Sequence, residues 1–139
     1  MDVAGETVGE IAGGLLVLVG VAPGDTDADA DTLAAKICGL RIFPDSDGAM
    51  NLSVADIDGS ILVVSQFTLL ADIRKGRRPS FIGAAGPHEA RAIVDRIVDQ
   101  VRGQGVAAAS GEFGAAMMVS LVNSGPVTIV IDVAGGRIV

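Results

Sequence analysis

The chain has 139 residues and a formal net charge of -7, with 50% of its residues hydrophobic and 19% charged. This size suits a single domain over residues 1–139, and the composition excludes a disordered chain. No apolar run approaches the roughly 18 residues of a membrane span, so no membrane partner is expected. The single cysteine, Cys38, cannot form an internal disulfide and fits a reducing, cytoplasmic compartment. The acidic balance argues against a generic nucleic-acid-binding protein with a basic surface.

The first third of the chain predicts two strands and a helix. Alternation of apolar and polar residues over Thr7–Ile11 predicts a short strand, and the valine-rich run Leu15–Val21 predicts a buried one. A turn then leads into Asp25 and Thr26, either of which can cap a helix. Apolar residues at helical spacing continue that helix until Gly39.

The remainder predicts a loop, a long strand, a second loop, a second helix and further strands. Phe43–Met50 is rich in turn residues, Ile61–Leu70 is mostly apolar and predicts a strand, and Asp72–Gly86 is polar and basic. Pro87 suits the first turn of a helix that has one apolar face and ends at Gly103. Three further strands are expected over Val106–Ala109, Met117–Val122 and Val127–Val133. This order predicts an α+β or mixed-sheet domain.

Common catalytic and metal-binding patterns are missing. The alternating aspartates that begin at Asp25 lack the Gly and Glu of a calcium loop, because Ala30 and Lys36 stand at those positions. His88 is the only histidine and lies on a polar stretch beside a proline, so neither a Ser-His-Asp triad nor a histidine-ligated metal is favoured. Any chemistry must then use backbone donors, hydroxyls, amides or groups of the substrate.

A basic cluster stands out against the acidic background. Arg74, Lys75, Arg77 and Arg78 are four of the chain's ten basic residues. A solvated loop and an anion site are equally favoured interpretations. If it is an anion site, phosphate is the natural ligand. The acidic remainder restricts such a contact to a local feature such as the end of an RNA, and the low aromatic content of 3% leaves few stacking platforms for a long single strand.

Two polar segments interrupt apolar strands. Ser65, Gln66 and Thr68 lie in the predicted strand Ile61–Leu70, where their polar groups are either satisfied by the structure or face a cleft near the strand end. Asn123–Thr128 makes a tight turn whose Gly-Pro bond is a candidate for the cis form. Taken alone, that turn is best interpreted as an ordinary hairpin connection.

Together with the basic cluster, these segments resemble the D-aminoacyl-tRNA deacylases, also called D-tyrosyl-tRNA deacylases. The stretches that carry the resemblance are Gly14–Val21, Lys36–Phe43, Met50–Ser53, Val64–Leu69, Arg74–Phe81 and Val119–Thr128. They extend over nearly the whole chain, and the pair Ser65–Thr68 and Asn123–Thr128 is highly specific when both occur in this order.

The resemblance implies an α+β fold of curved, mostly antiparallel or mixed β-sheets flanked by two helices. It implies hydrolysis of the ester that joins a D-amino acid to the 3′-terminal adenosine of tRNA, with rejection of L-aminoacyl-tRNA, and in some members removal of glycine mischarged on tRNA-Ala. It implies a homodimer that needs no metal or organic cofactor. Two alternatives stay open, namely a tRNA-end binding module without turnover and a small-molecule esterase.

The resemblance also implies roles for the catalytic segment. Ser65 and Gln66 would line the pocket for the terminal adenosine and the aminoacyl group, and a backbone N–H of Phe67 or Thr68 would polarise the ester carbonyl. Thr68 has been viewed in the family as a nucleophile. Without an adjacent base, attack by water with help from the adenosine 2′-hydroxyl fits this sequence better.

The remaining roles concern binding and chirality. Met117 or Met118 would pack on the adenine, and Arg74, Lys75, Arg77 and Arg78 would hold acceptor-stem phosphates. A cis Gly125-Pro126 bond would reach the partner's active site and oppose any L side chain. Asn123 and Thr128 belong to the same substrate-binding motif. The family also begins with a further strand, which carries a Gln-Arg-Val stretch and precedes the segment aligned with Val3–Ile11; we expect that strand to be missing here.

Overall fold

A three-stranded parallel sheet forms the centre of the molecule. The computed structural model describes every residue from Met1 to Val139. Strands β3 (Gly14–Val19), β6 (Ser60–Ser65) and β7 (Ala107–Ser110) pair in the order β3-β6-β7, both pairs parallel. The central strand carries four consecutive buried residues, Ile61–Val64. Such an unbroken apolar run is typical of a parallel strand that is covered on both faces.

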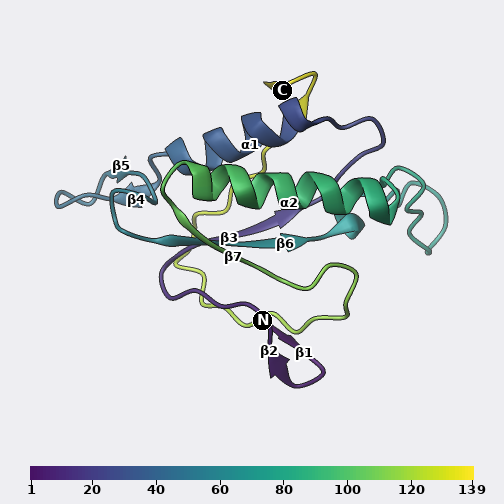
Figure 1. The fold of residues 1–139 in the computed structure, drawn as a ribbon, viewed down its shortest axis with the longest axis horizontal. Helices are drawn as coiled ribbons and strands as arrows, with labels where there is room; N and C mark the ends of the chain where they lie inside the picture. Colours follow the sequence, from purple (N-terminus) through teal and green to yellow (C-terminus); the bar gives the residue numbers. More distant parts are fainter.

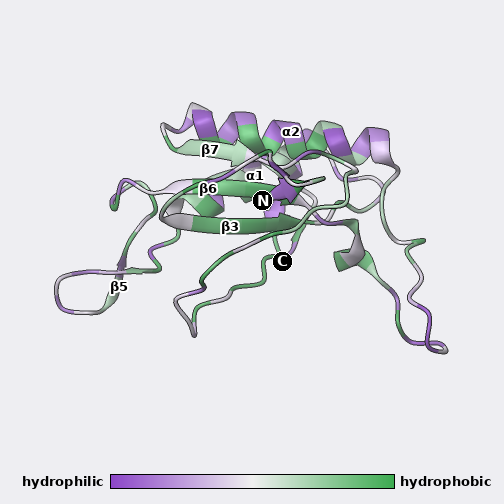
Figure 2. Ribbon diagram, turned by 90° about the horizontal axis from the view of Figure 1, so that it is seen from below, coloured by the Kyte–Doolittle hydropathy of each residue, from purple (hydrophilic) through white to green (hydrophobic).

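Both helices cover the same face of this sheet. Helices α1 (Asp27–Gly39) and α2 (Pro87–Gly103) lie above the sheet in Figure 1, while the first residues and the segment after β7 pass below it. In Figure 2, α2 alternates between hydrophilic and hydrophobic residues along its length, as an amphipathic helix should. Its buried residues recur every three or four positions: Ala90, Ile93, Val94, Ile97, Val98 and Val101. Arg96 joins the helices by donating to both carboxylate oxygens of Asp31, at 2.8 and 2.9 Å.

Alternation along β6 divides the core into two clusters. Ile61 and Val63 face the helices and belong to a cluster of 16 buried residues. Leu62 and Val64 face the opposite side and pack with Met1. Successive side chains of a strand point to opposite faces, so one central strand serves both clusters.

The helix predictions are confirmed. Helix α1 begins after Thr26, and the Asp29 carboxylate accepts the Thr26 backbone N–H at 2.9 Å. Helix α2 begins at Pro87 and ends at Gly103, as expected. Neither helix is both long and apolar enough to cross a membrane.

The expected strand boundaries need correction in the first half of the chain. The only ladder near the N-terminus pairs β1 (Asp2–Val3) with β2 (Glu6–Thr7), and β2 ends at Thr7, so Thr7–Ile11 is not a strand. The loop Phe43–Met50 includes a short hairpin of β4 (Phe43–Pro44) with β5 (Met50–Leu52).

The expected strand Ile61–Leu70 ends early. Strand β6 stops at Ser65, and a 3₁₀ helix, η1 (Phe67–Leu70), follows. The ladder ends there because Val19, the partner of Ser65, is the last residue of β3.

The predicted strands near the C-terminus are mostly unpaired. Val106–Ala109 corresponds to β7, but the segment 117–132 forms only one isolated bridge, between Asp2 and Met118. Strand β8 (Val133–Ala134) pairs with β9 (Arg137–Ile138). Strand-like sequence forms a ladder only with a partner strand, and no strand of this chain pairs with 119–132. The α+β class with two helices is confirmed, with parallel pairing in the central sheet and antiparallel pairing in three two-stranded sheets.

Candidate active site

The predicted catalytic segment lies at the carboxyl end of β6. The Gln66 backbone N–H donates to the Val19 carbonyl at 2.7 Å, which makes it the last bond between β6 and β3. The chain then turns into η1, so Phe67 and Thr68 lie on the surface beyond the sheet. In open parallel sheets, ligands bind beyond the carboxyl ends of the strands. Gln66 and Thr68 satisfy each other by a side-chain hydrogen bond at this exposed strand end, and that they face a substrate cleft stays a prediction.

Helix η1 presents two backbone donors. Its first internal bond runs from the Leu69 N–H to the Gln66 carbonyl at 3.2 Å. The N–H groups of Phe67 and Thr68 therefore have no acceptor within the helix, as is general for the first residues of a helix. Two adjacent N–H groups of this kind can stabilise a developing oxyanion.

The Thr68 hydroxyl has no base beside it. Its hydrogen-bond partner is the Gln66 side-chain amide, which donates from Nε2 to Oγ1. An amide donor does not remove a proton from a hydroxyl. His88 lies exposed at the start of α2, and Cys38 is buried in α1, where burial raises the pKa of its thiol. No cluster of three His, Cys, Asp or Glu side chains could hold a metal ion.

Gly20 allows η1 to pack against the end of β3. A Cβ atom at this position would collide with Leu70 Cδ2 and lie 3.1 Å from Leu69 Cβ. It would also lie 3.3 Å from the Gln66 carbonyl oxygen. The packing of Leu69 and Leu70 against this position therefore leaves little room for any side chain here. Gly20 could not be singled out from the sequence, because nothing in the sequence reveals which segment will approach it.

The basic loop, residues 72–80, follows directly after η1. The backbones of Asp72 and Ser80 exchange two hydrogen bonds, of 2.7 and 2.9 Å, which close the loop. Asp72 also accepts from the Arg74 guanidinium at 2.7 and 2.9 Å, and these bonds hold the pKa of the Asp72 carboxyl below its usual range. The other three cations of the loop make no ion pair and are exposed to solvent: Lys75, Arg77 and Arg78.

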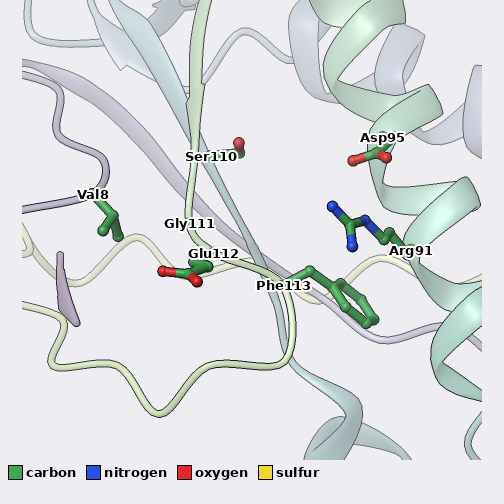
Figure 3. A pocket seen from close by; sticks show the side chains of 7 residues that line it. All are labelled: Val8, Arg91, Asp95, Ser110, Gly111, Glu112 and Phe113. Atoms are coloured by element: carbon green, nitrogen blue, oxygen red, sulfur yellow. The ribbon is translucent and has the colours of Figure 1, made fainter. Parts of the chain in front are cut away.

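A cavity of about 400 Å³ lies beside the same end of the sheet (Figure 3). One wall of the cavity includes Gly111, whose N–H donates to the Val63 carbonyl at 3.2 Å. Val63 lies on β6, two residues before Ser65. Arg91 and Asp95 project toward the cavity from α2, facing the segment that carries Glu112. The lining residues are Val8, Arg91, Asp95, Ser110, Gly111, Glu112 and Phe113. None of them was predicted from the sequence, since the recognisable motifs lie on either side of the segment that carries Ser110–Phe113.

The two predicted adenine contacts differ in their surroundings. Met117 packs against the smaller core cluster, and its Sδ atom lies 2.9 Å from where a Cβ of Gly111 would be. Met117 therefore lies beside Gly111, which lines the cavity, but does not line the cavity itself. Met118 is 75% exposed and bridges to Asp2 through its backbone.

The Gly-Pro turn lies away from η1 within one chain. The Gly125-Pro126 bond is cis, and a Cβ at Gly125 would meet nothing within 4 Å. Inside the turn, Asn123 Nδ2 donates to Thr128 Oγ1 at 3.3 Å. Figure 1 shows the yellow-green segment that contains this turn near the amino ends of β3 and β6, whereas η1 follows their carboxyl ends. No hydrogen bond joins the two motifs, which within one chain lie toward opposite ends of the central sheet.

Comparison with known proteins relates the chain to the D-aminoacyl-tRNA deacylases. A model of the family described as "D-Tyr-tRNA(Tyr) deacylase" matches residues 1–132. The chain is 58% identical over 130 residues to a D-aminoacyl-tRNA deacylase of Dehalococcoides mccartyi, covering 94% of this chain and 85% of the relative. It is 57% identical over 134 residues to one of Herpetosiphon aurantiacus, covering 96% and 88%.

Two solved structures share the fold. The c-Myc DNA Unwinding Element Binding Protein superposes with a TM-score of 0.83 at 36% identity, covering 92% of this chain and 87% of that one. A probable eukaryotic D-amino acid tRNA deacylase superposes with a TM-score of 0.67 over 81% of each chain. At 20% identity, the second shows likeness of fold alone.

Proposed function

The chain belongs to the D-Tyr-tRNA(Tyr) deacylase family, and from this membership we infer that it hydrolyses the ester bond of D-aminoacyl-tRNA, releasing the free D-amino acid and tRNA. The observation that carries this inference is the family match over residues 1–132, which includes both polar motifs and the basic loop. The cytoplasm, where aminoacyl-tRNA is used, is the compartment in which we expect it to act.

The reaction that fits the site is attack by water on the ester carbonyl. The N–H groups of Phe67 and Thr68 stabilise the negative charge that develops on the carbonyl oxygen. The oxygen of water bonds to the carbonyl carbon, the bond to the ribose 3′-oxygen breaks, and a proton is transferred to that oxygen. The 2′-hydroxyl of the terminal adenosine assists the proton transfer. The hydrogen bond between Gln66 and Thr68 supports this route over attack by Thr68, because it offers no base.

The substrate is held at three places. Ser65 and Gln66 contact the terminal adenosine and the aminoacyl group, and the cavity beside Met117 receives the nucleoside. The position of that cavity at the carboxyl end of β6 supports this placement. The basic loop binds acceptor-stem phosphates, which is supported by the free cations Lys75, Arg77 and Arg78.

The chirality filter is completed by a second copy of the chain. In this proposal, Gly125 and Pro126 of one subunit reach the η1 site of the other and occupy the space that an L side chain needs. The turn is exposed, remote from its own η1, and flanked by the exposed apolar residues Leu121, Val122 and Val130. A surface of this kind suits burial against another protein surface. Glycine has only hydrogen at the L position, so glycyl-tRNA is accepted.

The test is a comparison of D-Tyr-tRNA with L-Tyr-tRNA under identical conditions. We expect rapid hydrolysis of the D form and a rate with the L form close to that without protein. Equal hydrolysis of both would remove the filter. Tight tRNA binding without hydrolysis of either would identify a binding module, and faster hydrolysis of simple amino-acid esters than of D-Tyr-tRNA would identify a small-molecule esterase.

A further inference from the structure

We propose that Phe81 is a positioning residue that couples the basic loop to η1, so that binding of the tRNA acceptor stem raises the rate of the ester cleavage step. The inference rests on the proposed function and goes beyond it. The site residues described above explain how the 3′ end is cleaved, but they do not explain how the enzyme detects that this end belongs to a complete tRNA.

The coupling contact is a pair of aromatic rings. Phe81 packs on Phe67 with ring centroids 5.1 Å apart and an interplanar angle of 73°, an edge-to-face arrangement. Phe67 is the first residue of η1 and carries one of the two proposed oxyanion donors. Pairs of this geometry are attractive beyond the burial of their area. The ring of Phe81 therefore acts directly on the element that presents the N–H groups.

The covalent connection reinforces this contact. Only Ala71 separates Leu70, the last residue of η1, from Asp72 at the base of the basic loop. The two hydrogen bonds between Asp72 and Ser80 close that base, and Phe81 follows immediately. The loop therefore begins at the end of η1 and returns, through the Phe81 ring, to its start.

The far side of the loop is anchored to the sheet. The Phe81 carbonyl accepts the Ala84 N–H at 3.0 Å, and the Ala85 N–H donates to the Val21 carbonyl at 2.8 Å. These bonds hold the backbone that follows Phe81 close to the end of β3. A ligand that restricts the motion of the loop tip therefore also restricts Phe81, and through the ring contact it restricts Phe67.

The unpaired positive charges of the loop determine where the tRNA binds. Asp72 neutralises Arg74 at the base, whereas Lys75, Arg77 and Arg78 are unpaired and exposed. Phosphates bound to these three cations fix the loop, and through Phe81 they fix η1 in the geometry that suits the transition state. A short substrate that carries only the terminal nucleoside does not reach the loop and does not gain this effect.

The experiment compares two substrates, D-Tyr-tRNA and D-tyrosyl-adenosine esterified at the 3′ position. With the unmodified chain, we expect kcat to be higher for D-Tyr-tRNA. Phe81→Ala should lower kcat for D-Tyr-tRNA roughly three- to tenfold, the range that corresponds to loss of one aromatic pair. It should leave KM for D-Tyr-tRNA and both constants for D-tyrosyl-adenosine unchanged, because the cations and the N–H groups remain.

Two further variants serve as a control and as a replacement for Phe81→Ala. Ile82→Ala is the matched control, because Ile82 is the next residue in the chain and is 91% exposed. It should behave as the unmodified chain does. Phe81→Leu keeps an apolar side chain but removes the ring, so it should lose the kcat advantage as Phe81→Ala does, and it replaces Phe81→Ala if that variant does not fold.

The outcomes separate this inference from the proposed function. Equal kcat for both substrates with the unmodified chain, or an equal loss on both substrates with Phe81→Ala, would overturn the coupling while leaving the deacylase activity in place. No hydrolysis of either substrate by the unmodified folded chain would overturn the proposed function itself.

Discussion

Individual residues at the carboxyl end of β6 determine the proposed chemistry. Ser65, Gln66 and Thr68 could be selected from the sequence, because polar residues in an apolar strand need a reason to be there, whereas Phe67 was selected through the family resemblance. Gly20 could not be selected, because its role depends on a contact with η1 that only the folded chain creates. A similar limit applies to Arg91 and Glu112, which line the cavity but look like ordinary surface charges in the sequence.

Thr68 distinguishes the two mechanisms. Thr68→Val removes the hydroxyl and keeps the backbone N–H, so we expect most of kcat on D-Tyr-tRNA to remain, together with a small loss from the missing bond to Gln66. Single-turnover hydrolysis measures this directly. Complete loss of hydrolysis in a variant that melts at the same temperature as the unmodified chain would restore Thr68 as the nucleophile.

Gly20 tests whether η1 must pack against the end of β3. Gly20→Ala introduces a Cβ that collides with Leu70, so η1 must shift and kcat should fall while KM changes little. Overpacking of this kind costs about 1–3 kcal/mol of stability, which urea unfolding measures. Gly39→Ala is the control, because nothing lies within 4 Å of its Cβ position. Unchanged kcat in folded Gly20→Ala would show that the position of η1 is not critical.

Secondary-structure elements divide into those specified locally and those that depend on a partner. Thr26, Pro87 and Gly103 mark the helix ends correctly, because caps and breakers act within a few residues. The segments 117–122 and 127–132 carry strand-like sequence but form no ladder, because a ladder also requires a partner strand; Met118 alone bridges to Asp2. The turn into η1 escaped prediction for the same reason, since β6 ends where its partner β3 ends.

Asp29 makes the stability of α1 depend on pH. Hydrogen bonds from the backbone N–H groups of Thr26 and Gly136 lower the pKa of Asp29 below its usual 3.8. A carboxyl with a lowered folded pKa contributes stability above its unfolded pKa, and this is lost as the pH falls through the folded value. Asp29→Asn should therefore be less stable than the unmodified chain at pH 7, with a difference that shrinks below about pH 4.

Urea unfolding at neutral and acidic pH provides the measurement for Asp29. Asp27→Asn removes a charge from the same helix end without a hydrogen bond, and it should show a smaller effect. A destabilisation by Asp29→Asn that stays constant across this pH range would contradict the assigned cause.

At the scale of the whole molecule, two surface features bear on the proposed binding partners, namely the distribution of charge and the exposed apolar side chains. The chain has a net charge of -7, yet the basic loop concentrates positive charge at the end of the sheet where η1 lies. The segment that carries the Gly-Pro turn exposes large apolar side chains, with Val122 98% and Val130 86% exposed. The first feature suits a polyanion held locally, and the second suits a second copy of the chain.

The basic loop should determine the salt dependence of KM. Replacing Arg77 and Arg78 together by Ala should raise KM for D-Tyr-tRNA and reduce the slope of log KM against log salt by about 0.7–0.9 for each phosphate that is no longer neutralised. Arg137→Ala removes an equal kind of charge from β9, beside α1, and serves as the control. If the double variant had the same KM and the same slope as the unmodified chain, the loop would not bind phosphate.

The central claim is that the catalytic segment of one subunit receives its chirality filter from the other, and mixed subunits test it most directly. Pro126→Ala alone should hydrolyse L-Tyr-tRNA as well as D-Tyr-tRNA, whereas Gln66→Ala should be inactive. A mixed dimer of one Pro126→Ala subunit and one Gln66→Ala subunit can be purified with two different affinity tags. Its only competent site lies in the Pro126→Ala subunit, which keeps Gln66 and receives an intact Pro126 from the Gln66→Ala subunit. We predict that this mixed dimer hydrolyses D-Tyr-tRNA and spares L-Tyr-tRNA. Continued hydrolysis of L-Tyr-tRNA by the mixed dimer would contradict the account, because it would mean that each site uses its own turn.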